Sequence, residues 1–409
     1  MITENDVLNS VPAVGFVRSY IDYGMRQTTA PAAYHLAVAL SILSTTCPPS
    51  YQSPFVGGTA VNLYVLLAGR SGLERKSTAL RIGHDLLFHA APHRIGDQIG
   101  SAEGLIDSLA QDGRNRQIIS FSEFGKFLAS AQRGYFETVK TALTDLWDSR
   151  PVQRTLAGNN VIRIEEPRLS CMAACAIPYL EKHTLLEDWT GGFMGRWALM
   201  YAKEERSVAY PIADNAGRQD LIDRLADLDA IESHGICRGL TDEAMEYWEL
   251  WYEKYCSPNV VEDTNVAGLR ARLPPIAQKA SMLYAWELGI GSGQDDWLMN
   301  TELVHFGCLF AQLHLQSSQA LASKIAATPD ARLRRQVLDV FEKQNKGCNL
   351  SLGDVIKGCK LSKRKTTEIL DGLVEEGTLR LNMINGKNFY MYGTYDVEDE
   401  PTYVRLHRG

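Results

Sequence analysis

The sequence predicts an α/β core followed by a small C-terminal module of three helices and a β-hairpin. Two apolar runs support the core, because one leads into a glycine-bearing loop at 69–78 and the other ends in an acid at position 123. The module rests on the pattern after residue 330, where three helical stretches precede two strand-like stretches joined by Asn385-Gly386.

The length of 409 residues predicts two to three domains. Changes in periodicity and polarity divide the chain further. We expect a helical cap at 1–55, an α/β core at 56–210, a helical lid region at 211–328, the C-terminal module at 329–393 and an acidic, mobile tail at 394–409.

Composition excludes several classes of protein. The net charge of −7 argues against a protein that coats nucleic acid by charge alone, although it is compatible with a local basic module. The eight cysteines are scattered, which is typical of reduced thiols rather than of a disulfide framework or a zinc site. The N-terminus has no leader-like pattern, and no apolar stretch reaches the length of about eighteen residues that spanning a membrane requires. We therefore expect a cytoplasmic protein without a membrane partner.

The loop at 69–78 reads GRSGLERKST, between an apolar strand and a helix. This order is that of a P-loop, in which backbone N–H groups and a lysine hold nucleotide phosphates and a hydroxyl supports magnesium. Lys76 and Ser77 fit the last two roles. The loop is one residue longer than usual, and Arg75 replaces the glycine that normally precedes the lysine. The alternative is an ordinary surface turn. The other predicted ATP-contacting residues are Gly69, Ser71, Gly72, Arg75 and Thr78.

The apolar run at 117–125 predicts a buried strand that ends in Ser122 and Glu123. Beside a P-loop, Glu123 would polarise the attacking water, and Ser122 would stand where an aspartate normally supports Mg²⁺. A serine carries no charge, so this substitution weakens the metal site formed with Ser77. The alternative for Glu123 is an exposed carboxylate without a role. On the next strand and beyond it, Cys175 and Thr184 are candidates to sense the terminal phosphate, but we favour packing roles for both.

The stretch at 189–201, WTGGFMGRWALMY, predicts a double-glycine turn that carries Arg196 at a loop tip. Such an arginine reaches across a subunit boundary to a neighbour's nucleotide, where its planar fork suits phosphate charge. The alternative is an ion pair with an acid such as Asp188. Further along, 216–325 is helical and brings Arg270, Arg272 and Lys279 near the core. One of the three could contact nucleotide, but for each residue taken singly we favour a solvated basic face.

The C-terminal module predicts a winged helix-turn-helix. Its helices are expected at 333–342, 351–357 and 363–376, and its hairpin at 378–382 and 387–392. Between 331 and 392 there are 12 Lys and Arg against 7 Asp and Glu, a net charge of +5. Duplex DNA binding needs such charge at the start of the recognition helix and at the wing tip. The alternative is a protein-contact module. The predicted DNA-binding residues are Lys363, Arg364, Lys365 and Lys387.

Five stretches in order, APAAYHLAVALSIL, GRSGLERKSTAL, ISFSEFGKFL, GGFMGRW and RLPPIAQKASMLYAW, resemble a family of P-loop proteins of phages and mobile elements. The resemblance covers roughly 14–325. Members often accompany primase and polymerase domains and look like hexameric helicase-type ATPases of the additional-strand, RecA/AAA-like class, distantly related to the minichromosome-maintenance motor. The resemblance implies that Arg196 is an arginine finger, which acts on the nucleotide of a neighbouring subunit, and that Lys279 is a second residue that senses the nucleotide.

The expected function is therefore that of an oligomeric, DNA-dependent ATPase, acting as helicase, translocase or loader in phage or mobile-element replication. We expect ATP and Mg²⁺ as cofactors, DNA as partner, a homo-oligomer of the hexameric-ring type, and primase or polymerase as further partners. Lys76, Glu123 and Arg196 would be the catalytic residues. One rival is a non-catalytic or nucleotide-gated DNA-binding scaffold with a degenerate P-loop, which Arg75 and Ser122 favour. Another is a dimeric transcriptional regulator built on the winged helix.

Overall fold

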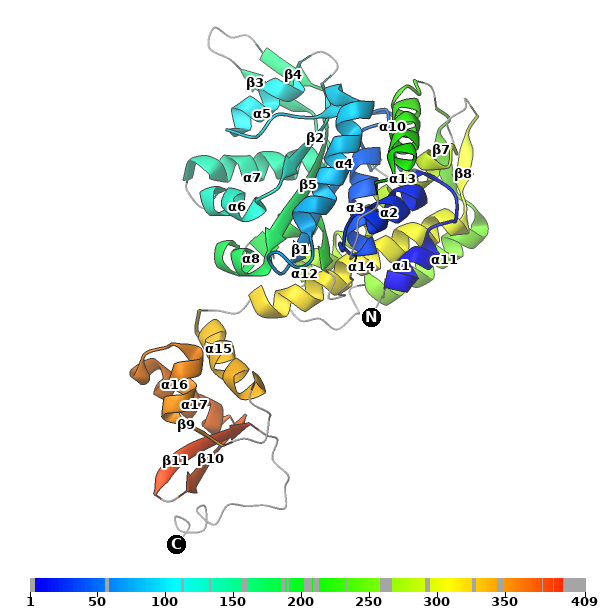
Figure 1. Ribbon diagram of the computed structural model, residues 1–409. Coiled ribbons are helices and arrows are strands. Elements are labelled where there is room, and N and C mark those ends of the chain that lie inside the picture. The colour runs from blue at the N-terminus through cyan, green and yellow to red at the C-terminus, as the bar shows by residue number, and fades with distance from the viewer. Residues whose placement is uncertain are drawn as a thin grey trace. The chain divides into compact units, whose positions relative to one another are not determined.

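A computed structural model gives the structure of the protein, and Figure 1 shows its elements. The residues it describes are 4–55, 59–111, 114–131, 134–155, 161–184, 188–189, 191–201, 208, 213–232, 234–257, 267–290, 295–325, 329–343, 349–376, 378–384 and 386–392. The chain divides into two compact units, Met1–Ala326 and Ala327–Gly409. The stretches predicted as cap, core and lid region all fall in the first unit, apart from the last two residues of the lid. The predicted acidic tail lies outside the described residues.

A four-stranded parallel sheet forms the centre of the first unit, in the order β2-β5-β1-β6. All six residues of β1 are buried, as are eight of the nine of β5, which explains why both strands read as continuous apolar runs. The strands are β1 (Tyr64–Gly69), β2 (Arg116–Phe121), β5 (Arg168–Ala176) and β6 (Trp197–Tyr201). The sequence therefore predicted the α/β class correctly, and the structure shows that the central sheet is parallel.

Helices cover both faces of this sheet. Figure 1 shows α6, α7 and α8 on one side of it, with α3 and α4 on the other. Eleven of the twelve residues of helix α3 are buried, because nine of the twelve are alanine, leucine, isoleucine or valine and the helix packs against β1 and β5. The bounds are α1 (Glu4–Ser10), α2 (Phe16–Gln27), α3 (Ala32–Leu43), α4 (Lys76–Ala90), α5 (Ala102–Leu109), α6 (Phe124–Ala131), α7 (Gly134–Trp147) and α8 (Ile177–His183).

Among the other helices of the first unit, α13 (Leu273–Glu287) and α14 (Thr301–Ile325) pack against each other, α11 and α12 pack on this pair, and α10 packs on α4 and α2. From Ile276 to Glu287 every residue of α13 is buried, so this helix has no solvated face over that range. That observation contradicts the basic surface considered for Lys279. The other bounds are α10 (Asn215–Asp229), α11 (Asp242–Tyr255) and α12 (Ala267–Arg270), with the strands β7 (Cys237–Leu240) and β8 (Trp297–Met299) paired in parallel.

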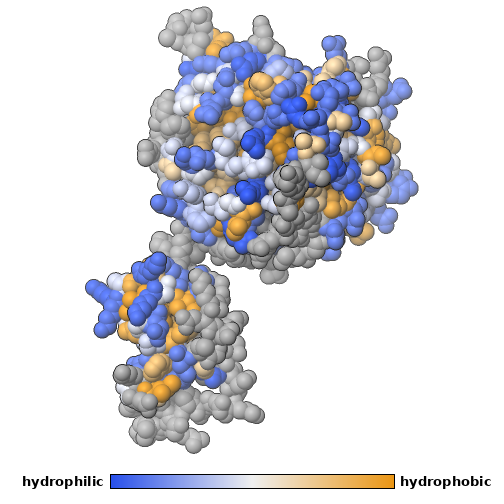
Figure 2. Space-filling view, in the orientation of Figure 1, coloured by the Kyte–Doolittle hydropathy of each residue, from blue (hydrophilic) through white to orange (hydrophobic). Residues whose placement is uncertain are grey.

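A separate antiparallel hairpin, β3 (Val152–Thr155) and β4 (Val161–Ile164), precedes β5 in the chain. The sequence predicted β4 as a strand but read 149–160 as a polar turn. Burial alternates between intermediate and exposed along β3, so neither face carries the apolar pattern that identifies a strand. Figure 2 shows hydrophilic surface interrupted by apolar patches on the visible faces of both units.

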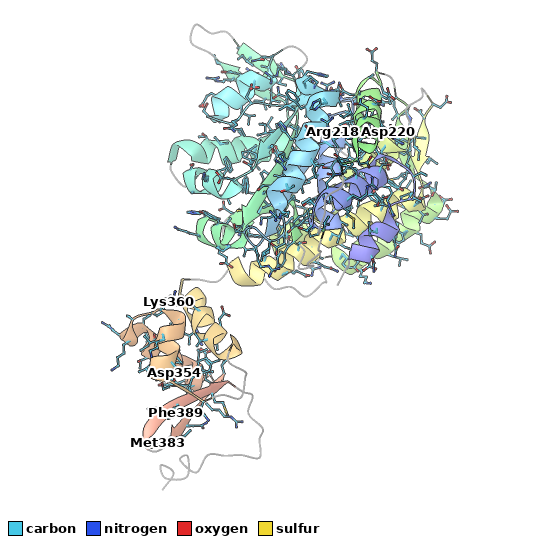
Figure 3. All side chains as sticks on the ribbon, in the orientation of Figure 1. Arg218, Asp220, Asp354, Lys360, Met383 and Phe389 are labelled. Atoms are coloured by element: carbon cyan, nitrogen blue, oxygen red, sulfur yellow. The ribbon has the colours of Figure 1, made fainter. Side chains whose placement is uncertain are left out.

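The second unit contains three helices and a three-stranded antiparallel sheet in the order β10-β11-β9. It has its own core, which includes Val337, Val355 and Leu370. A capping box between Ser351 and Asp354 begins the second helix, and Figure 3 labels Asp354 there. The bounds are α15 (Pro329–Lys343), β9 (Leu350–Ser351), α16 (Leu352–Cys359), α17 (Lys363–Glu375), β10 (Leu379–Ile384) and β11 (Lys387–Tyr392).

None of the helices in the described ranges combines the length and the apolarity that crossing a lipid bilayer requires.

Candidate active site

The loop between β1 and α4 leaves the carboxyl end of the sheet and enters the helix at Lys76. Two of its residues adopt left-handed backbone conformations, Gly72 with φ of 78° and Arg75 with φ of 47°. Glycine adopts this conformation freely, whereas it costs a residue with a side chain roughly 1 kcal/mol. Arg75 therefore occupies, at some strain, a position where glycine would fit best, which is where the usual P-loop pattern has one.

The Lys76 side chain folds back over its own loop. Its Nζ donates to the Arg70 carbonyl oxygen at 2.7 Å, and only 7% of the residue is exposed. Burial lowers the pKa of Lys76, while the nearby Glu74 carboxylate acts in the opposite direction. Glu74 is itself buried and accepts from Arg70 Nε at 2.6 Å. The buried Lys76 ammonium thus lies at the start of α4, where it contacts the Arg70 carbonyl of the loop. The start of a helix is also where its dipole favours anions.

A cavity of about 300 Å³ opens beside this loop. It brings together most of the nucleotide-site residues that the sequence predicted, because parallel strands end at the same edge of the sheet and only β5 separates β1 from β2. Gly69 is not part of the lining, since it lies under the loop against Tyr34 and Glu74. The predicted residues that line the cavity are Ser71, Gly72, Arg75, Lys76, Ser77, Thr78, Ser122 and Glu123.

Five lining residues were not predicted as site residues: Gly125, Lys126, Ala174, Ala176 and Tyr179. Lys126 forms a salt bridge with Glu123, one turn earlier in the chain, and both side chains are largely exposed. This ion pair raises the pKa of Lys126. The i, i+3 spacing of an acid and a lysine was a signal present in the sequence. Tyr179 comes from α8, which no local pattern connects to the loop.

The residues that the sequence predicted for a magnesium site are the two serines, Ser77 and Ser122. Both line the cavity, beside the Glu123 carboxylate. Among the described residues no group of three or more His, Cys, Asp or Glu could hold a metal ion. Mg²⁺ usually keeps several waters and binds through one or two protein groups together with substrate phosphates, and this donor set fits that mode.

Cys175 and Thr184 differ in position. Cys175 lies at the tip of β5 and lines the cavity, where burial raises its pKa to about 12 and keeps it a neutral thiol. Thr184 is buried away from the cavity lining and donates to the Leu180 carbonyl at 2.6 Å. The packing role expected for Thr184 agrees with this geometry. The seven described cysteines all carry free thiols.

The structure corrects the expected position of Arg196. Its side chain is buried rather than presented at a loop tip, and it forms an ion pair with Asp148 at 2.9 Å instead of with Asp188. Its Nη1 also donates to the Gly192 carbonyl at 3.0 Å. Asp188 pairs with Lys140 at 2.7 Å. A buried arginine with these partners is not available to a neighbouring subunit as it stands.

Lys279 also differs from expectation. It is fully enclosed, and its Nζ donates to the backbone carbonyl of Asn62 at 2.8 Å, to the Asn62 side-chain oxygen at 2.9 Å and to the Trp147 carbonyl at 3.2 Å. Burial lowers its pKa strongly. Asn62 precedes β1, whereas the loop follows it, so a strand of six residues, roughly 20 Å long, separates Lys279 from the cavity. Lys279 therefore lies beyond the end of β1 that is opposite to the cavity.

Arg196 and Lys279 belong to one cluster around Trp147. Arg196, Arg272 and Lys279 lie 5.6, 5.7 and 4.1 Å from the centre of its ring. Arg196 and the start of β6 lie at the amino end of the sheet, because Trp197 pairs with Tyr64 at the start of β1. The cluster therefore occupies the edge opposite to the cavity. Arg270 is held elsewhere, by the Tyr255 carbonyl at 2.9 Å.

Three of the four predicted DNA-binding residues, Lys363, Arg364 and Lys365, lie at the start of α17. Ser362 caps this helix by accepting from the Lys365 backbone N–H, and Lys363 and Arg364 are exposed in its first turn. Lys365 is half-buried and lies 3.5 Å from Glu368. The side chain of Lys387 lies outside the described part of the structure. The hairpin also exposes apolar side chains on β10, at Leu381, Met383 and Ile384, which is a feature of protein contacts as well.

No protein-family model matches the sequence, and no curated protein matches it. The fold and the cavity therefore carry the functional interpretation.

Proposed function

We propose that the first unit binds ATP with Mg²⁺ and hydrolyses it, and that the chain is an oligomeric DNA-dependent ATPase of helicase, translocase or loader type. One observation carries the proposal: a single cavity is lined by Lys76 and Ser77 from the β1–α4 loop and by Glu123 from the end of β2. The order β2-β5-β1 supports a P-loop core of the additional-strand, RecA/AAA-like class, because one strand separates the two that carry these groups.

The chemistry follows from the contacts. Phosphate oxygens would replace the Arg70 carbonyl as acceptors for Lys76, and a buried ammonium gains more from an anion than from a neutral carbonyl. Glu123 orients the attacking water and accepts its proton. Ser77 and Ser122, which line the cavity, would hold Mg²⁺ or its waters, and the ion would neutralise phosphate charge.

The second unit supports DNA as the partner. Three helices followed by a hairpin are the elements of a winged helix-turn-helix, and the exposed Lys363 and Arg364 lie where a recognition helix meets phosphates. Because Arg196 is buried, a ring in which subunits complete each other's sites needs either its release from Asp148 or another arginine of the same cluster. We extend the proposal to hexamers that act with a primase or polymerase in phage or mobile-element replication, on the resemblance described above.

A second function, a nucleotide-gated DNA-binding scaffold, is favoured by two specific observations. Arg75 adopts a left-handed conformation that suits glycine, and no carboxylate stands at Ser122. Both features weaken hydrolysis more than binding. In that case ATP would change DNA affinity without being consumed.

A measurement of DNA-stimulated ATP hydrolysis by the full chain distinguishes the ATPase from the nucleotide-gated scaffold. We expect turnover that rises with DNA and is lost in Lys76→Ala and in Glu123→Gln. Lys254→Ala and Glu249→Gln, at exposed positions on α11, are matched controls that should behave as the wild type. ATP binding without turnover in folded, assembled protein would support the scaffold. Absence of both binding and turnover would exclude the ATPase proposal.

A further inference from the structure

One face of α8 presents an aromatic and basic surface beside the cavity. Tyr179, Lys182 and His183 have the i, i+3, i+4 spacing that places side chains on one helix face. The Tyr179 ring is stacked on that of His183, with centroids 6.0 Å apart and planes at 24°. The Tyr179 side chain is 53% exposed. We call Tyr179, Lys182, His183 and Lys126 the α8 surface.

Close packing fixes this surface to the active site. Gly125, in the first turn of α6, leaves room for the Tyr179 ring, since a Cβ there would lie only 2.7 Å from the Tyr179 Cβ. The next residue, Lys126, is 73% exposed. Lys126 and Tyr179 line the same cavity as Lys76 and Glu123. A ligand on the α8 surface would therefore contact the residue that is paired with the predicted catalytic carboxylate.

A second cavity continues from the first along β2. It has a volume of about 300 Å³, and Glu123 and Lys126 line both cavities, so this ion pair lies at their junction. The second cavity is also lined by the polar residues Gln98, Ser120 and Ser130 and by two aromatic residues, Phe121 and Phe127. The α8 surface and the second cavity are thus neighbours that meet at the Glu123–Lys126 ion pair.

We propose that the α8 surface binds single-stranded nucleic acid, with a base stacked on Tyr179 and a backbone phosphate held by Lys126 and Lys182. An exposed ring accepts any unpaired base, whereas a duplex hides the faces of its bases. Two lysines beside the ring supply the charge that a phosphate backbone requires. A protein partner would favour apolar neighbours around the tyrosine, and the residues that flank it on this face are lysine and histidine.

The site has a consequence for catalysis that rests on the proposed ATPase function. In the structure the Lys126 ammonium is paired with Glu123, which holds that carboxylate in an ion pair rather than leaving it to a water molecule. A nucleic-acid phosphate offers Lys126 a competing anion. When Lys126 binds the phosphate, Glu123 is free to orient the attacking water. Lys126 is thus a positioning residue that links strand binding to hydrolysis.

Photo-crosslinking tests the binding site without requiring turnover. The full chain is irradiated with a single-stranded oligonucleotide that carries 5-iododeoxyuridine, and crosslinked peptides are located by mass spectrometry. We expect a crosslink at Tyr179 that disappears in Tyr179→Ala, with roughly fivefold weaker binding or more, whereas Tyr252→Ala on α11 is unchanged. Crosslinks confined to the second unit would overturn the proposal. An unchanged crosslink pattern in Tyr179→Ala, with altered native mass, would assign the surface to a protein contact instead.

Turnover measurements test the link to Glu123. Lys126→Gln should raise DNA-free ATP hydrolysis several-fold and reduce its stimulation by single strands, while Lys126→Arg and the Lys254→Gln control keep the wild-type response. Equal stimulation in the wild type and Lys126→Gln would overturn the coupling. The two proposals fail separately: crosslinking at Tyr179 without any ATP turnover contradicts the ATPase, and DNA-stimulated turnover without this crosslink contradicts the α8 surface.

Discussion

Replacing Lys279 by methionine tests whether this residue is structural or contacts nucleotide. Methionine keeps most of the volume but donates no hydrogen bond. The Asn62 side-chain oxygen still accepts from Ser149, and the Trp147 carbonyl still accepts from the Asn62 amide. Within the described residues, the backbone carbonyl of Asn62 would be left without a donor, at a cost of about 2 kcal/mol. Loss of the cation 4.1 Å from the Trp147 ring adds about 1–2 kcal/mol.

Relief of ammonium burial offsets part of this cost, so we expect the free energy of unfolding of the first unit to fall by about 3 kcal/mol. This corresponds to a melting temperature lower by about 6–10 °C. All seven tryptophans lie in the first unit, so their fluorescence reports its unfolding alone. ATP affinity measured below the transition should be unchanged, whereas Lys76→Met should lose affinity and keep its stability. Wild-type stability together with a tenfold loss of ATP affinity in Lys279→Met would refute the structural role.

Three further predictions use the same fluorescence assay or ATP binding. Burial raises the pKa of Glu287 to about 7, from 4.5, so the folded state binds this proton more tightly than the unfolded state and loses stability as pH rises. Relative to Glu287→Gln, the wild type should lose about 2 kcal/mol between about pH 5 and about pH 8, and a constant difference would contradict the assignment. Asp148→Asn removes the carboxylate paired with buried Arg196 and should cost about 3 kcal/mol, whereas a change below about 0.5 kcal/mol would show that the pair is dispensable. Gly69→Ala places a Cβ 2.8 Å from the Tyr34 hydroxyl, so the loop must shift and ATP affinity should fall several-fold, which equilibrium binding would detect; unchanged affinity would mean that the loop tolerates the shift.

The sequence predicted the parts of the site that depend on short stretches of chain. Lys76 and Ser77 follow directly from the strand that precedes them, and Glu123 follows its own strand. Because both strands are parallel and buried, their ends meet at one edge, and the predicted residues line one cavity. The helices and the hairpin of the second unit were also placed correctly, since their caps and periodicity are local signals.

The environments of Arg196 and Lys279 were not predictable in the same way. Asp148 lies 48 residues before Arg196 in the chain, and Asn62 lies 217 residues before Lys279. Whether a cation at such a position is exposed or enclosed depends on which distant helix packs over it. Here the end of α7 supplies Trp147 and Asp148, and the sequence around Arg196 and Lys279 contains no signal of either residue.

The strand order also fixes the distance between the two parts of the candidate active site, the β1–α4 loop and Glu123. The β1–α4 loop and Glu123 are carried by strands that each pair with β5, so their separation equals two strand spacings, roughly 10 Å. This length is fixed by backbone hydrogen bonds in the buried sheet and does not depend on the loop sequence. An extra loop residue, or an arginine in place of glycine, can therefore alter phosphate affinity without displacing the carboxylate. The sheet acts as a spacer that keeps the distance across the site constant when the loop sequence is changed.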